Sequence, residues 1–161
     1  MIPRYFVVAE SEHELQNPTS EEKISLLGRR LGLGPGSRVL DIASGRGGPA
    51  VLIAREFECA VHGVEIAPEF HAVAVERAAA EGLSERVSFE LGDAAGATFE
   101  PESYDAALCP GASFAFGSLA TRLTPSRRRC GLTAMSSWGS RSGAGFLFLT
   151  TTRIETIRGR P

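Results

Sequence analysis

The segment D-I-A-S-G-R-G-G, residues 41–48, has the composition of a ligand-binding loop in this chain of 161 residues. Its three glycines allow the backbone to turn tightly and to approach a bound molecule without an intervening Cβ atom. The segment follows an apolar run of strand length and precedes a stretch that reads as a helix. A glycine-rich turn between a strand and a helix is typical of a nucleotide-type binding loop.

Two acidic residues further along the chain have the chemistry to complete such a site. Glu65 ends an apolar run and can accept hydrogen bonds from both hydroxyls of a ribose. Asp93, in the sequence G-D-A, can accept a hydrogen bond from an adenine amino group. A single acidic residue more often caps a helix or faces solvent, so the joint placement of Asp41, Glu65 and Asp93 carries the prediction of a nucleoside ligand.

The elements that must position these residues alternate between strands and helices. A helix is expected after residue 19, where Thr19 and Glu22 form a capping-box pattern, and further helices are expected over residues 49–57 and 68–80. Strands are expected over residues 38–43, 60–66, 87–91 and 104–109. This alternation predicts an α/β fold with a doubly wound parallel sheet, in which ligands bind at the carboxyl ends of the strands.

The ordered motifs V-L-D-I-A-S-G-R-G-G, G-V-E-I, G-D-A and Y-D-A-A-L-C resemble those of class I S-adenosylmethionine-dependent methyltransferases, over about residues 24–116. Residues 9–23 further resemble an uncharacterised bacterial subgroup of these enzymes. The resemblance implies a Rossmann-like fold and S-adenosylmethionine as cofactor. The cofactor-binding residues that it implies are Asp41, Ala43, Ser44, Gly45, Gly47, Glu65, Ile66, Asp93 and Ala94.

Within this set, the resemblance assigns the loop that begins at Asp41 to the methionine part of the cofactor. It assigns Glu65 to the ribose, and Asp93 with Ala94 to the adenine. Ala43 departs from the family, which usually has a glycine at the corresponding position, but alanine is also small.

A dinucleotide site of the NAD type is an alternative interpretation of the glycine-rich loop. Residues 45–50 fit the pattern G-x-G-x-x-A, which is weak evidence when taken alone. Asp41 and Asp93 fit the methyl-donor pattern and have no role in the dinucleotide pattern. The interpretation as a methyltransferase is therefore favoured.

Composition sets the broad class and the expected surroundings of the protein. The chain contains no apolar run long enough to cross a membrane and no secretory signal pattern, so we expect a cytoplasmic protein. Its three cysteines are widely spaced and form no C-x-x-C pair, so neither a disulfide framework nor a metal site is expected. Cys109 is interpreted as a core residue and Asp105 as a structural one.

The last forty residues differ in character from the rest of the chain. Residues 1–120 have a net charge of −9, whereas residues 121–161 have a net charge of +7 and contain 12 Ser and Thr residues. The sequence thus divides into an N-terminal segment (1–18), a partial S-adenosylmethionine-binding domain (19–120) and an atypical tail (121–161). The strands expected after the fourth are missing from this pattern, in which residues 146–149 form the only apolar run of strand length.

We interpret the tail as the product of a shifted reading frame. When residues 121–146 are back-translated with permitted codons, the neighbouring frame contains a P-D-G turn, a V-V-V strand and a G-E-P-F-W segment that resembles the bacterial subgroup. A native, basic and partly disordered extension is the alternative. Three adjacent arginines, residues 127–129, are typical of a nucleic-acid contact, but no nucleic-acid partner is expected if this segment is out of frame.

The expected activity is methyl transfer from S-adenosylmethionine to a small-molecule acceptor that the sequence does not identify. No catalytic residue is assigned, although His13 is a candidate for a role beside the substrate. The alternative is a non-catalytic fragment that retains at most nucleotide binding.

Overall fold

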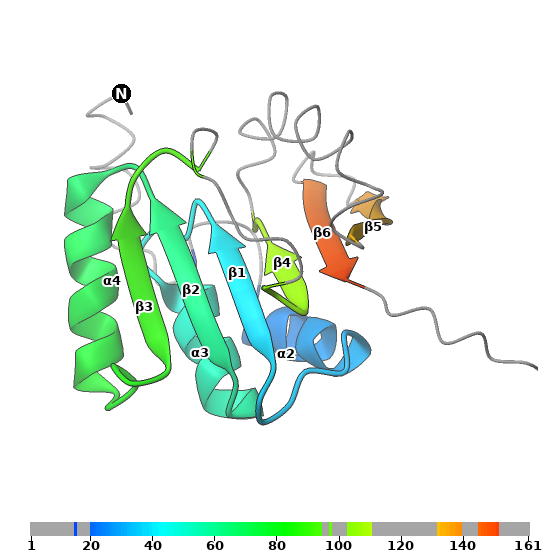
Figure 1. Ribbon diagram of the computed structural model, residues 1–161, viewed down its shortest axis with the longest axis horizontal. Coiled ribbons are helices and arrows are strands. Elements are labelled where there is room, and N and C mark those ends of the chain that lie inside the picture. Colours follow the sequence, from blue (N-terminus) through cyan, green and yellow to red (C-terminus); the bar gives the residue numbers. More distant parts are fainter. Residues whose placement is uncertain are drawn as a thin grey trace, which may run out of the picture.

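The computed structural model describes residue 15, residues 20–94, residue 97 and residues 103–110, together with the backbone of residues 132–139 and 145–151. The elements are arranged around one sheet (Figure 1). The helices are α2 (Glu21–Arg30), α3 (Gly48–Phe57) and α4 (Pro68–Ala80). The strands are β1 (Arg38–Ile42), β2 (Ala60–Glu65), β3 (Val87–Leu91), β4 (Ala106–Leu108), β5 (Leu132–Gly139) and β6 (Gly145–Thr151).

The first four strands form a parallel sheet, as the sequence predicted. The strand order is β3-β2-β1-β4-β6-β5. β1 pairs in parallel with β2 on one side and with β4 on the other, and β2 pairs in parallel with β3. The winding therefore reverses beside β1, and in open α/β sheets a ligand binds at the carboxyl ends of the strands next to such a point.

The predicted helices and strands lie where the sequence places them, with shorter strand ends. β1 ends at Ile42 because Ala43 has a positive φ of 54°, which breaks the extended backbone. β2 ends at Glu65, before Ile66, and β4 spans three residues of the six that were predicted. α4 and β3 have the predicted bounds.

The first helix begins one residue later than the capping-box pattern predicted. Ser20 is the N-cap residue, and its hydroxyl accepts a hydrogen bond from the backbone N–H of Lys23 at 3.4 Å. The assignment of Thr19 as the cap was therefore wrong, and Thr19 itself lies outside the described residues. Because Lys23 stands where a capping box needs Glu or Gln, only the forward hydrogen bond of the box forms.

The core lies between the helices and one face of the parallel sheet. Fully or almost fully buried residues of β1, β2 and α3 form its centre, among them Val39, Val61 and Ile53. α2 packs closely on α3, since a Cβ at Gly28 would collide with the ring of Phe57. In Figure 1, α2 and α3 lie behind the sheet, and none of the described helices crosses its front. Among the described residues no helix is both long and apolar enough to cross a membrane.

The parallel part of the sheet ends at β4, as expected, but two antiparallel strands of the tail extend the sheet beyond it. β5 and β6 form an antiparallel hairpin, and β6 pairs antiparallel with β4 through Ala106↔Thr150 and Ala107↔Leu149. The apolar run noted in the tail lies within β6, where aromatic and β-branched residues favour strand backbone. The hairpin pairs with the edge of β4 that would otherwise carry unpaired backbone groups.

Candidate functional site

The loops after β1, β2 and β3 all lie at the carboxyl ends of the parallel strands, where the strand arrows end in Figure 1. The loop after β1 is shaped by left-handed backbone at Ala43, Gly45 and Gly47, with φ values of 54°, 56° and 75°. It is fixed by a hydrogen bond from the Ser44 N–H to the carbonyl of Val64, at 3.1 Å. The predicted loop residues are therefore held beside the end of β2.

Glu65 connects all of these loops. Its Oε2 accepts a hydrogen bond from the Gly45 N–H at 2.8 Å, and its Oε1 accepts one from the Ala67 N–H at 2.8 Å. Its main-chain carbonyl accepts a hydrogen bond from the Gly92 N–H, also at 2.8 Å. The residue is 3% exposed, so these backbone donors, and not bulk water, satisfy its carboxyl oxygens.

This geometry adds a role that the sequence did not predict for Glu65. We expected its carboxylate to face a ribose, and the structure shows both oxygens already accepting backbone hydrogen bonds. An ionised carboxylate offers about four acceptor positions, so each oxygen keeps a further lone pair for a ligand hydroxyl. Glu65 is thus a loop-organising residue whose capacity to accept is only partly used.

Asp41 lies at the end of β1 and is completely buried. Neither of its carboxylate oxygens has a hydrogen-bond partner in the described part of the chain. Burial, followed by repulsion from Glu65, raises the pKa of Asp41 to about 8. A buried carboxyl group without a partner is costly, which indicates that its environment is incomplete without a ligand.

The same loop contains a second polar group in this condition. Ser44 is 5% exposed, and its hydroxyl oxygen also lacks a hydrogen-bond partner within the described residues. Asp41 and Ser44 were both predicted cofactor residues, and the structure leaves their polar atoms unused. This observation fits a site that is completed by a polar ligand.

The loop after β1 is packed tightly against α4 and the Phe89 ring. A Cβ at Gly47 would lie 2.7 Å from the Phe89 ring and 3.2 Å from the Ala74 backbone. A Cβ at Gly63, in β2, would collide with Phe89 and lie 2.9 Å from the Ser44 hydroxyl. The absence of side chains at these two glycines is therefore what lets the loop sit this close to β2 and α4.

The predicted adenine residues lie at the carboxyl end of β3. Asp93 is exposed and Ala94 is half-buried. Ile66 is 42% exposed, and Leu91, which pairs with Glu65 across the two strands, is 50% exposed. Sequence reasoning missed Leu91, although an apolar residue immediately before G-D was its signal. Two exposed apolar side chains beside a carboxylate suit a flat, partly polar ring.

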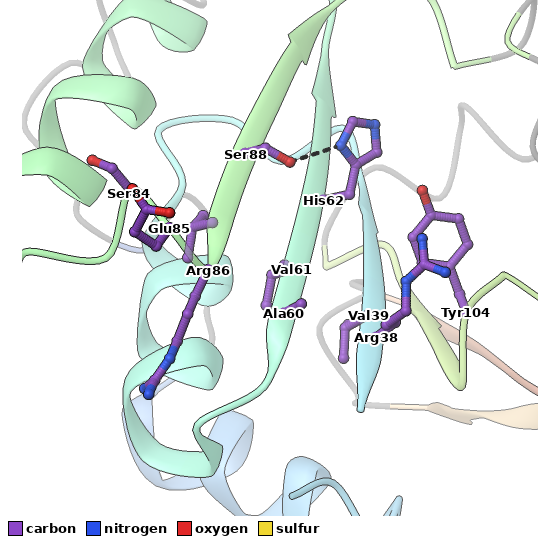
Figure 2. A pocket seen from close by; sticks show the side chains of 11 residues that line it. Arg38, Val39, Ala60, Val61, His62, Ser84, Glu85, Arg86, Ser88 and Tyr104 are labelled. Atoms are coloured by element: carbon purple, nitrogen blue, oxygen red, sulfur yellow. Dashed lines mark hydrogen bonds between the residues drawn. The ribbon is translucent and has the colours of Figure 1, made fainter. Parts of the chain in front are cut away.

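A cavity of about 240 Å³ lies elsewhere, at the amino ends of β1, β2 and β3. Figure 2 shows His62 within it, and His62 Nδ1 lies 3.0 Å from the Ser88 hydroxyl. The ring of His62 is roughly parallel to that of Tyr104, with centroids 6.3 Å apart. None of the predicted cofactor residues lines this cavity, so it is distinct from the candidate site.

The remaining sequence interpretations concern residues outside the candidate site. Asp105 accepts a hydrogen bond from the Arg38 N–H at 2.8 Å, which confirms its structural role at the start of β4. Cys109 is fully buried, as expected of a core residue. His13 lies outside the described residues.

The fold, a parallel sheet with helices packed on it, is the Rossmann-like fold of class I methyltransferases. Residues 39–125 match a protein family described as a methyltransferase domain, and the chain belongs to this family. A relative in Escherichia coli K12, the uncharacterised protein YjhP, is 43% identical over 119 residues, which is 74% of this chain and 48% of the relative.

Two solved structures are similar in both sequence and fold. The S-adenosylmethionine-dependent methyltransferase from Thiobacillus denitrificans, in complex with S-adenosylhomocysteine, is 39% identical with a TM-score of 0.69, over 76% of this chain and 49% of that one. The corresponding enzyme from Geobacter sulfurreducens, with the same ligand, is 37% identical with a TM-score of 0.71, over 80% and 51%. The chain spans about half the length of the relatives it matches.

Proposed function

We propose that the chain binds S-adenosylmethionine with the loops that follow β1, β2 and β3. We further propose that the bound cofactor donates its methyl group to a small-molecule acceptor. The observation that carries the proposal is the convergence of these loops on Glu65, beside the buried, unpartnered carboxyl of Asp41. The likeness to relatives solved with S-adenosylhomocysteine supports it.

Each part of the ligand has residues suited to it. The amino-acid part carries an ammonium group, which matches the unpartnered carboxyl of Asp41 and the unpartnered hydroxyl of Ser44. The ribose hydroxyls match the free acceptor positions of Glu65. The adenine matches the exposed apolar side chains of Ile66 and Leu91, with Asp93 as an acceptor for its amino group.

The chemistry that S-adenosylmethionine supplies is an electrophilic methyl group on a sulfonium. The protein would contribute mainly the alignment of this methyl group with the nucleophilic atom of the acceptor. Glu65 and the glycine-rich loop fix the position of the donor, while no described residue is assigned as a general base.

Titration calorimetry tests the binding proposal. S-adenosylhomocysteine should bind with a stoichiometry of one, and NAD should not bind, because the dinucleotide interpretation gives Asp41 and Asp93 no role. If S-adenosylhomocysteine gives no binding heat at every pH tested between 6 and 8.5, the assignment of these loops as the cofactor site is refuted.

A further inference from the structure

Two residues of the candidate cofactor site, Asp41 and Glu65, are buried carboxyl groups with different hydrogen-bond surroundings. Asp41 on β1 and Glu65 on β2 are 0% and 3% exposed. Glu65 receives two backbone hydrogen bonds, from Gly45 and Ala67. Asp41 receives none from the described residues. The described residues thus supply two hydrogen-bond donors to the carboxyl group of Glu65 and none to that of Asp41.

No charged group on the described elements around Asp41 is among the causes that would favour its ionised form. On the β2 side, its register partner is Gly63, and the charged residue is Glu65. On the β4 side, its register partner is the apolar Leu108. The loop that follows β1 contributes Arg46, which is not among the causes of the raised pKa of Asp41. α3 begins with Gly48 and has no acidic or basic residue in its first turn.

We propose that Asp41 holds a proton while no ligand is bound and releases that proton to solvent when the ammonium group of the cofactor's amino-acid part arrives. The proposal rests on the proposed function and adds to it a requirement for a positively charged ligand group. The site gives up a proton and takes up the ammonium group in its place. The raised pKa of Asp41, about 8, is consistent with a neutral carboxyl at neutral pH.

The exchange is a proton transfer from Asp41 to solvent and needs no direct contact between the carboxyl group and the ligand. The O–H bond of Asp41 breaks, the proton goes to water or buffer, and the carboxylate left behind faces the ligand's cation. An opposite charge within roughly 4–6 Å is sufficient to favour the ionised form of a carboxyl group. Ligands that carry the adenosine part but no ammonium group should therefore bind without releasing the proton.

The number of protons released is measured by titration calorimetry at pH 6.5 in buffers that differ in ionisation enthalpy. S-adenosylhomocysteine should release about one proton per molecule bound, because a group of pKa about 8 is almost fully protonated at that pH. 5′-Methylthioadenosine, which has the nucleoside and the sulfur but no amino acid, should release close to none. The affinity for S-adenosylhomocysteine should rise roughly tenfold per pH unit up to about pH 7.5 and level off above pH 8.

The Asp41→Asn variant is the matched control, since asparagine imitates the neutral form of the carboxyl. Its affinity for S-adenosylhomocysteine should be nearly independent of pH over the same range, with no proton released. If this variant does not fold, the comparison of the two ligands on the unaltered protein still decides. Equal proton release with both ligands, or none with S-adenosylhomocysteine, would overturn the proposal.

Infrared spectroscopy of the ligand-free protein separates this proposal from the proposed function. A protonated carboxyl band that disappears between pH 7 and 9 should be present in the unaltered protein and absent from Asp41→Asn. If the band is present but no ligand binds at pH 8.5, the proposed function fails while the protonation of Asp41 stands. If ligand binds but the band is absent, the exchange is refuted and the proposed function remains.

Discussion

The Oε2 atom of Glu65 accepts a hydrogen bond from the backbone N–H of Gly45 at 2.8 Å, which joins the end of β2 to the glycine-rich loop after β1. The two residues are 20 positions apart in the sequence. Their contact determines where the loop lies before any ligand is present. A binding loop that is held in place in advance loses less conformational entropy on binding than a loop that must be ordered by its ligand.

Replacing Glu65 should therefore damage both the fold and the ligand site. Glu65→Ala leaves the buried N–H groups of Gly45 and Ala67 without their acceptor, at roughly 1–3 kcal/mol for each group. Binding of S-adenosylhomocysteine should weaken by a further 1.5–3 kcal/mol or so through the lost ribose contacts. Denaturant unfolding and calorimetry measure the two losses. Glu76→Ala, an exposed change on α4, is the control and should alter neither.

Asp41 should make the stability of the protein depend on pH in an unusual direction. The pKa of Asp41 is raised from 3.8 to about 8, so between these values the folded protein holds a proton that the unfolded chain has lost. Its contribution to stability is fully present below pH 3.8 and is lost as the pH rises through 8. The loss is on the order of several kcal/mol, because each tenfold change in proton affinity corresponds to about 1.4 kcal/mol.

The measurement is urea unfolding of the unaltered protein and of Asp41→Asn at several pH values from 4.5 to 8.5. The difference in free energy of unfolding between the two should shift in favour of the variant as the pH rises, because only the aspartate must become charged. A difference that stays constant over this range would contradict the assignment of a neutral Asp41.

The sequence predicted the parallel sheet because its pattern is local. Apolar runs of strand length, glycine or proline at element ends and helical spacing each depend on a few neighbouring residues, and they located α4 and β3 to the residue. The predicted role of Glu65 was less complete. That its carboxylate accepts from Gly45 and Ala67 depends on the register of two strands and the exact path of the loop, which a single sequence does not encode in any short pattern.

In the tail, residues 121–161, the overall composition was a poor guide to the strands that the structure contains. Its charge and its content of serine and threonine suggested a segment without strands, whereas the structure pairs β6 with β4. Composition describes the average of forty residues. The one apolar run of strand length among them, residues 146–149, lies within β6 and contributes little to that average.

Gly63 should tolerate a side chain poorly, because the Phe89 ring and the Ser44 hydroxyl both lie close to its Cβ position. In Gly63→Ala the new Cβ would collide with the Phe89 ring and lie 2.9 Å from the Ser44 hydroxyl. We expect a loss of roughly 1–3 kcal/mol of stability, as for other overpacked sites, and weaker ligand binding. Gly34→Ala is the control, since nothing lies within 4 Å of its Cβ position and its φ is not positive. Thermal unfolding that is the same for both variants would show that the Phe89 ring and the loop can move to make room for the added methyl group.

Ala43 should be a point where the protein gains stability by substitution. Its φ of 54° lies in the left-handed region, which costs an L-residue roughly 1–2 kcal/mol. Ala43→Gly removes this cost but adds backbone entropy to the unfolded chain, so the expected net gain is about 0.5–1 kcal/mol. Glu58, with a φ of 53° at the end of α3 and away from the site, provides a parallel substitution. Glu58→Gly should give a similar gain, and a loss of stability in both variants would refute the account.

Amide hydrogen exchange should decide whether the hairpin of the tail belongs to the sheet. The structure pairs Ala106 with Thr150 and Ala107 with Leu149, so the amides of β6 should exchange far more slowly than those of an unstructured peptide. Leu149→Pro removes one backbone donor from this hairpin and disturbs the strand, which should accelerate exchange throughout β5 and β6. Exchange in β1 and β2, which pair with each other on the far side of β4, should change little.

The interpretation of the tail as a shifted reading frame predicts the reverse result. Residues that were never selected to form the edge of a sheet should exchange freely, and Leu149→Pro should then have no effect on any amide. In that case β4 would be an edge strand with unpaired backbone groups, and a chain with the frame restored should unfold at a higher temperature and aggregate less. Protection of β6 comparable to that of β1 in the unaltered chain would instead show that the hairpin completes the sheet, and would remove the need for a shifted frame to account for the fold.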